Sequence, residues 1–68
     1  MTQKERIGKY LDDFGSITQL EAIRDLGIMR LGARIFEMIQ EGEPIIREME
    51  NGENRYGQTT HYARYRRA

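Results

Sequence analysis

Two short helical patterns separated by a glycine constrain this chain more than any other feature. Thr18 and Glu21 have the spacing of a capping box, in which two side chains bond each other's backbone N–H groups at a helix N-terminus. The apolar residues of the helix that follows lie on one side: Leu20, Ile23 and Leu26. Gly27 ends this helix after barely two turns, and a second helical pattern begins near Met29. The spacing predicts a helix-turn-helix over residues 16–35.

The segment before this unit is also helical. Thr2 and Glu5 form another capping box, and Gly15 supplies the left-handed residue that ends many helices. Between them, apolar residues recur at the spacing of one helix face: Ile7, Tyr10, Leu11 and Phe14. We therefore expect a helix from about Gln3 to Phe14. An extended link or brief strand at Ser16–Ile17 follows, with its isoleucine pointing inward.

The third predicted helix runs from near Met29 to Gly42, and Pro44 prevents its continuation. Its apolar stripe is expected to face the core: Leu31, Ile35, Met38 and Ile39. Ile28 should anchor the turn before it. Gly32 costs about 1 kcal/mol of helix propensity relative to alanine. Its missing side chain suggests either that a binding partner comes close to the helix there or that another helix crosses.

After Pro44 the pattern becomes β-type. Residues 45–49 and 59–65 are rich in strand formers and enclose two candidate turns, Asn51-Gly52 and Asn54–Gly57. A hairpin centred on Arg55-Tyr56 has arms of equal length, so we prefer the second turn. The expected architecture is α+β, with three helices followed by a C-terminal two-stranded β-hairpin, in one domain over residues 1–68.

This order of elements, together with several short motifs, resembles the small winged helix-turn-helix proteins of phages and prophages. The motifs that carry the resemblance are Thr18–Ala22, Leu26–Leu31, Ala33–Ile35, Asn54–Gly57 and Ala63–Tyr65. The resemblance covers nearly the whole chain and implies a winged helix-turn-helix fold. It also implies a duplex DNA-binding protein, either a phage-type transcriptional regulator or an excisionase-like architectural factor, with the third helix in the major groove.

The outward face of the third helix has the chemistry to read base edges. Arginine can bond guanine, glutamine adenine, alanine a thymine methyl and glutamate the amino group of cytosine. The candidate DNA-binding residues on this helix are Arg30, Ala33, Glu37 and Gln40, with Arg34 at the flank. Further candidates for phosphate or minor-groove contacts are Arg55 and Tyr56 at the hairpin tip and Arg66 and Arg67 in the C-terminal tail. For the residues of the helix and the turn the alternative is an ordinary solvated side chain. Arg64, Arg66 and Arg67 could contact phosphates or instead pair across the strands with glutamates of the facing strand, and for Arg64 we favour the pairing.

The first N–H groups of the third helix lack an obvious partner, because no Ser, Thr, Asp or Asn stands just before it. Water or a DNA phosphate could accept these hydrogen bonds.

The total charge argues against nucleic-acid binding. The 11 basic residues balance the 11 acidic ones, whereas DNA-binding domains usually carry a basic excess. Arginines dominate residues 22–36 and glutamates dominate residues 41–53, so the surface is polarised. The alternative function is a protein–protein interaction module on a winged-helix scaffold that docks to a host or phage protein. If the protein binds DNA, a homodimer or a partner protein would act with it on the DNA. If it is an interaction module, the host or phage protein is its partner and DNA is not.

The sequence gives little support to other functions. It has no cysteine and no long apolar run near its N-terminus, so we expect a cytoplasmic protein that does not enter membranes. His61 has no second histidine or cysteine with which to share a metal, and Asp12 and Asp13 point apart on their helix. Ser16 has no evident base. We expect no enzyme, metal, cofactor or small-molecule substrate.

Overall fold

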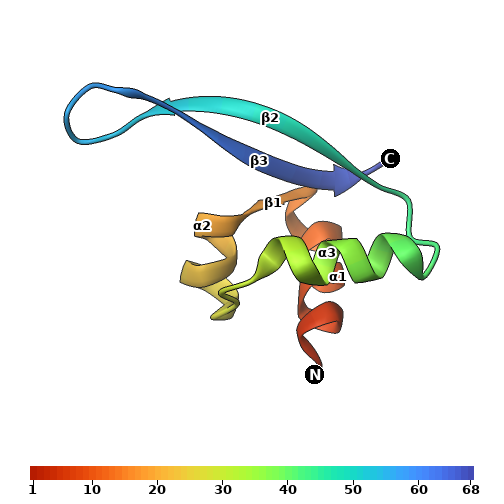
Figure 1. Cartoon of the computed structure of the whole chain (residues 1–68). Coiled ribbons are helices and arrows are strands. Elements are labelled where there is room, and N and C mark those ends of the chain that lie inside the picture. The colour runs from red at the N-terminus through yellow and green to blue at the C-terminus, as the bar shows by residue number, and fades with distance from the viewer.

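Three helical segments lie beneath a small antiparallel sheet (Figure 1). The computed structural model describes residues 1–68. The elements in chain order are α1 (Gln3–Phe14), β1 (Ser16–Thr18), α2 (Gln19–Glu21), η1 (Ala22–Leu26), α3 (Leu31–Gln40), β2 (Ile45–Glu53) and β3 (Thr59–Arg67). The predicted α+β order of three helices and a hairpin is confirmed.

Local capping fixes the ends of the first two helical segments. Both predicted capping boxes form: the Thr2 hydroxyl accepts from the Glu5 N–H at 3.1 Å, and the Thr18 hydroxyl accepts from the Glu21 N–H at 3.2 Å. Gly15 and the glycine after η1 both adopt left-handed backbone angles. η1 continues directly from α2 as a widened, π-type turn, so the two form one helical segment of the predicted length.

The core lies where the helices meet the base of the hairpin. Its members are Ile7, Tyr10, Leu11, Ile17, Ala22, Ile28, Leu31, Ile35, Met38 and Ile45. The inward orientation of Ile17 and the anchoring role of Ile28 are confirmed. Of the predicted apolar side of α2 and η1, only Leu26 packs against the core, whereas Leu20 and Ile23 are exposed. The segment is so short that one small residue, Ala22, makes its fully buried contact.

The sheet joins the segment after α1 to the C-terminal strand. The strand order is β1-β3-β2, and β1 pairs with the end of β3 through Ile17 opposite Tyr65. Ser16–Thr18 is therefore a brief strand. β2 and β3 each have nine residues, so the hairpin is longer than the predicted arms. The longer hairpin extends well past β1, and its outer half projects beyond the helices (Figure 1).

The hairpin turn lies at Arg55-Tyr56, as predicted. Asn54 organises it, because its side-chain oxygen accepts from the N–H groups of Tyr56 at 2.9 Å and Gln58 at 3.0 Å. Gly57 takes a left-handed φ of 75°, which glycine adopts without strain. The loop that carries Arg55 and Tyr56 is therefore held by hydrogen bonds to Asn54.

Candidate nucleic-acid interface

The N-terminus of α3 is capped by a side chain from α2. The Leu31 N–H donates to Oε1 of Gln19 at 3.0 Å, and Nε2 of the same amide donates to the Ile28 carbonyl at 2.9 Å. The helix begins at Leu31 rather than near Met29, since Arg30 is its N-cap residue and has a non-helical φ of −123°. The expectation of water or phosphate at this end is corrected for the first N–H, because Gln19 bonds it. Sequence reasoning missed this contact.

We expect Gln19→Ala to lower the free energy of unfolding by about 1–2 kcal/mol, because it leaves the Leu31 N–H and the Ile28 carbonyl without these bonds. Denaturant unfolding monitored by circular dichroism measures the effect. Gln3→Ala is the matched control, since Gln3 is exposed in the first turn of α1. Equal stabilities for the two variants would contradict the capping role.

The solvent-facing side of α3 is rotated from the predicted one. Ala33, Arg34 and Glu37 are half-buried, whereas Phe36 and Gln40 are exposed. Two further residues of α3 differ from what the sequence predicted. Ile39, expected in the core stripe, is 44% exposed. Gly32 meets neither a crossing helix nor open space, since its nearest neighbour is the Tyr65 hydroxyl of β3, 3.5 Å from where a Cβ would stand.

Ion pairs with α1 cover the flank of α3 that includes Glu37. Nζ of Lys4 lies 2.9 Å from Oε2 of Glu41 and 3.9 Å from Oε1 of Glu37, which brings α1 against this flank of α3. Glu37 also holds Arg34, whose Nη2 donates to Oε2 at 3.3 Å. The Arg34 Nε lies 3.2 Å from Oε1 without the geometry of a hydrogen bond, so we assign the bond to Nη2. Arg34 is thus engaged within the chain.

The N-terminal end of α3 and the hairpin tip point toward the same end of the molecule (Figure 1). Arg30 stands at the first and Arg55 at the second, and both are exposed. Tyr56, beside Arg55, is also exposed. Two candidate sites that are far apart in the sequence therefore face the same end of the molecule (Figure 1).

The C-terminal arginines lie at the other end, at the base of the hairpin, and are ion-paired. Arg66 pairs with Glu48 across the sheet. The guanidinium of Arg67 lies 3.1 Å from an Asp12 oxygen and 3.3 Å from a Glu43 oxygen, and it also donates to the Gly8 carbonyl. These groups tie the chain end to α1 and to the segment before β2.

Arg64 is part of a similar network. Its Nε donates to Glu50 at 2.8 Å and its Nη1 donates to the Ser16 hydroxyl at 3.0 Å. The hydrogen bond to Glu50 raises the pKa of Arg64, and the charge of Glu21 adds to the shift against the effect of burial. The predicted pairing of Arg64 with glutamates of the facing strand is confirmed.

Ion pairing within the chain engages most of its charged side chains. Nine of the 11 acidic residues form ion pairs, the exceptions being Glu5 and Glu53. The basic residues without an acidic partner are Arg6, Arg30, Arg47 and Arg55. Arg47 was not among the predicted binding residues, because the surrounding glutamates suggested an acidic strand. The positive groups left free thus include those at the start of α3 and at the hairpin tip.

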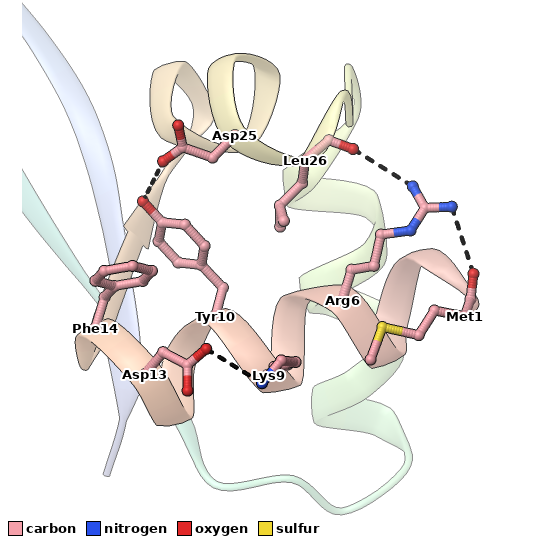
Figure 2. Close-up of a pocket in the computed structure, with 8 residues that line it drawn as sticks. All are labelled: Met1, Arg6, Lys9, Tyr10, Asp13, Phe14, Asp25 and Leu26. Atoms are coloured by element: carbon pink, nitrogen blue, oxygen red, sulfur yellow. Dashed lines mark hydrogen bonds and ion pairs between the residues drawn. The ribbon is translucent and has the colours of Figure 1, made fainter.

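A groove of about 380 Å³ between α1 and η1 is separate from this surface (Figure 2). Tyr10, Phe14 and Leu26 give it apolar walls. The Tyr10 hydroxyl donates to Asp25 at 2.6 Å, and together with the hydrogen bond from Arg24 this lowers the pKa of Asp25 to about 2, the Arg24 bond being the larger cause. The other charged groups of the groove also bond within the chain (Figure 2).

The comparisons with known proteins agree with this arrangement. A family profile described as a winged helix-turn-helix domain matches residues 2–66. The chain belongs to this family. No curated protein and no solved structure was matched.

Membership of the winged helix-turn-helix family suggests DNA binding and makes DNA the expected partner. Proteins of this family are typically non-catalytic. In the terms of the family, α2, η1 and α3 form the helix-turn-helix and the β2–β3 hairpin is the wing. None of the helices is long and apolar enough to cross a membrane.

Proposed function

We propose that this protein binds duplex DNA with α3 in the major groove and the wing against the flanking backbone or minor groove. The observation that carries the proposal is the position of Arg30 and Arg55. Both are exposed arginines without an acidic partner, and they stand at the same end of the molecule, at the start of α3 and at the wing tip (Figure 1). Such groups can bond phosphates or guanine without first breaking an ion pair.

The proposal keeps some of the other predicted contact residues and leaves others out. Gln40 is exposed on α3 and can pair with adenine, whereas Ala33, Arg34 and Glu37 lie at the edge of the exposed face. Tyr56 can donate its hydroxyl to a phosphate beside Arg55. We leave Arg66 and Arg67 out of the proposed contact set, because acidic side chains already bind them.

The biological setting we propose is a phage or prophage, as a transcriptional regulator or an excisionase-like architectural factor. The resemblance of the chain's motifs to small phage winged-helix proteins supports it. A single small domain buries a limited interface on DNA, so we expect specific action to need a homodimer or a partner protein on adjacent sites.

Comparison of duplex and single-stranded DNA tests the docking mode. A random-sequence duplex of about 20 base pairs, roughly two helical turns, and its separated strands are titrated with protein by fluorescence anisotropy at low salt. We expect tighter binding to the duplex, because only the duplex has a major groove to receive α3. Equal or tighter binding to single strands would contradict the proposal.

The rival function is docking to another protein. The exposed apolar side chains of Met29 and Phe36 near the proposed interface favour it, together with the zero net charge. It predicts no detectable binding to either form of DNA in the same titration.

A further inference from the structure

The exposed side of α3 carries a large apolar side chain where a nucleic-acid interface is usually polar. Phe36 is 60% exposed and takes no part in the core. Gln40 follows it by four residues, one turn further on the same side of the helix. If α3 lies in the major groove, Phe36 lies one turn from a group that can hydrogen-bond to bases.

The turn of α3 before Phe36 carries little side-chain bulk. Long side chains on a helix lean toward its N-terminus and cover the preceding turn. The residue one turn before Phe36 is Gly32, which adds no side chain there. The nearest group to the Cβ position of Gly32 is the Tyr65 hydroxyl, at ordinary contact distance. The Tyr65 hydroxyl borders this spot on one side, and a partner can reach the ring from the solvent, where both Gly32 and Phe36 are exposed.

A phenylalanine can recognise one kind of group on the major-groove edge of DNA. The bases present hydrogen-bond donors and acceptors there, and the only apolar group is the C5 methyl of thymine. Phenylalanine offers no hydrogen bond, so favourable contact comes from burying that methyl against the ring. Gln40 stands about 6 Å further along the helix, which corresponds to about two base-pair steps.

We infer that Phe36 is a specificity-determining residue that packs on a thymine methyl, and that Gln40 pairs with an adenine about two base pairs away. The inference rests on the proposed DNA-binding function. It identifies the target as duplex DNA containing A·T pairs and assigns part of the selectivity to a methyl group.

Replacing thymine by uracil removes this methyl and keeps every hydrogen-bonding group of the base. The probes are an alternating adenine–thymine duplex of about 20 base pairs and the same duplex with uracil, which offer or lack a methyl in every register. We expect wild-type protein to bind the thymine duplex about three- to tenfold more tightly. Phe36→Ala should bind the two duplexes equally, and Phe36→Leu should restore part of the preference.

Phe14→Ala is the matched control, since Phe14 is 69% exposed but lies on α1, beside the groove. It should keep the wild-type preference for thymine. Equal binding of the two duplexes by wild type, or a preference that survives in Phe36→Ala, would overturn the role of Phe36 while leaving DNA binding intact. Failure of wild type to bind either duplex at low salt would instead overturn the proposed function, and this inference with it.

Discussion

Arg30→Ala is expected to weaken binding to random-sequence duplex DNA by roughly ten- to hundredfold, the value of a lost charge-assisted hydrogen bond. The thermal midpoint should not change, because Arg30 is exposed and makes no capping bond to α3. The slope of log affinity against log salt should become less steep by about one unit if the lost contact is to a phosphate. Anisotropy titrations at several salt concentrations measure both quantities.

Arg24→Ala removes the same charge from a side chain that is engaged elsewhere. Arg24 is exposed, but its guanidinium is bonded to Asp25 at 2.8 and 3.0 Å. We expect its effect on DNA binding to be much smaller. Similar losses in the two variants would mean that total charge, rather than the position of Arg30, governs binding.

Ile35→Ala is expected to lower the free energy of unfolding by about 2–5 kcal/mol, because it leaves a cavity under α3. Ile35 is 2% exposed and belongs to the core cluster. A domain of 68 residues has a total stability of only roughly 3–10 kcal/mol. The variant should therefore be partly or wholly unfolded at room temperature, as thermal melts and denaturant titrations would show.

Ile39→Ala makes the same substitution one turn further along α3, at a side chain that is 44% exposed. We expect it to cost less than about 1.5 kcal/mol, because a partly solvated side chain leaves little cavity. Losses of equal size would show that the helix is oriented as its apolar spacing alone predicts, with both isoleucines in the core.

Local features of the fold could be predicted because both partners stand within a few residues. The capping box of Thr2 and Glu5 and the Asn54 turn are of this kind, and both are confirmed. The same is true of the left-handed Gly15. Backbone geometry at these positions depends on neighbouring side chains, which the sequence displays directly.

Long-range contacts could not be predicted from spacing. Gln19 caps a helix that starts 12 residues later, and Ile17 pairs with Tyr65 across most of the chain. A glutamine in the first turn of a helix is unremarkable in sequence, so nothing signalled that its amide would bond the next helix. Which surfaces meet is decided by packing of the whole chain.

The candidate site shows the same limit. The outward face of α3 depends on which flank is covered, and Lys4 of α1 covers the side that includes Glu37. Phe36, which was not among the predicted contact residues, is exposed. The availability of each arginine depends on acidic partners that can be distant, as Arg67 and Asp12 are. Residue type alone therefore could not show that Arg67 has acidic partners and that Arg30 has none.

The salt dependence of duplex binding tests the central claim most directly. Protein is titrated into a labelled random-sequence duplex at several salt concentrations, and log affinity is plotted against log salt. With two phosphate contacts, one from Arg30 and one from Arg55, affinity should fall about twelvefold between roughly 50 and 200 mM salt. No detectable binding at the lowest salt, or an affinity that does not change with salt, would contradict the account.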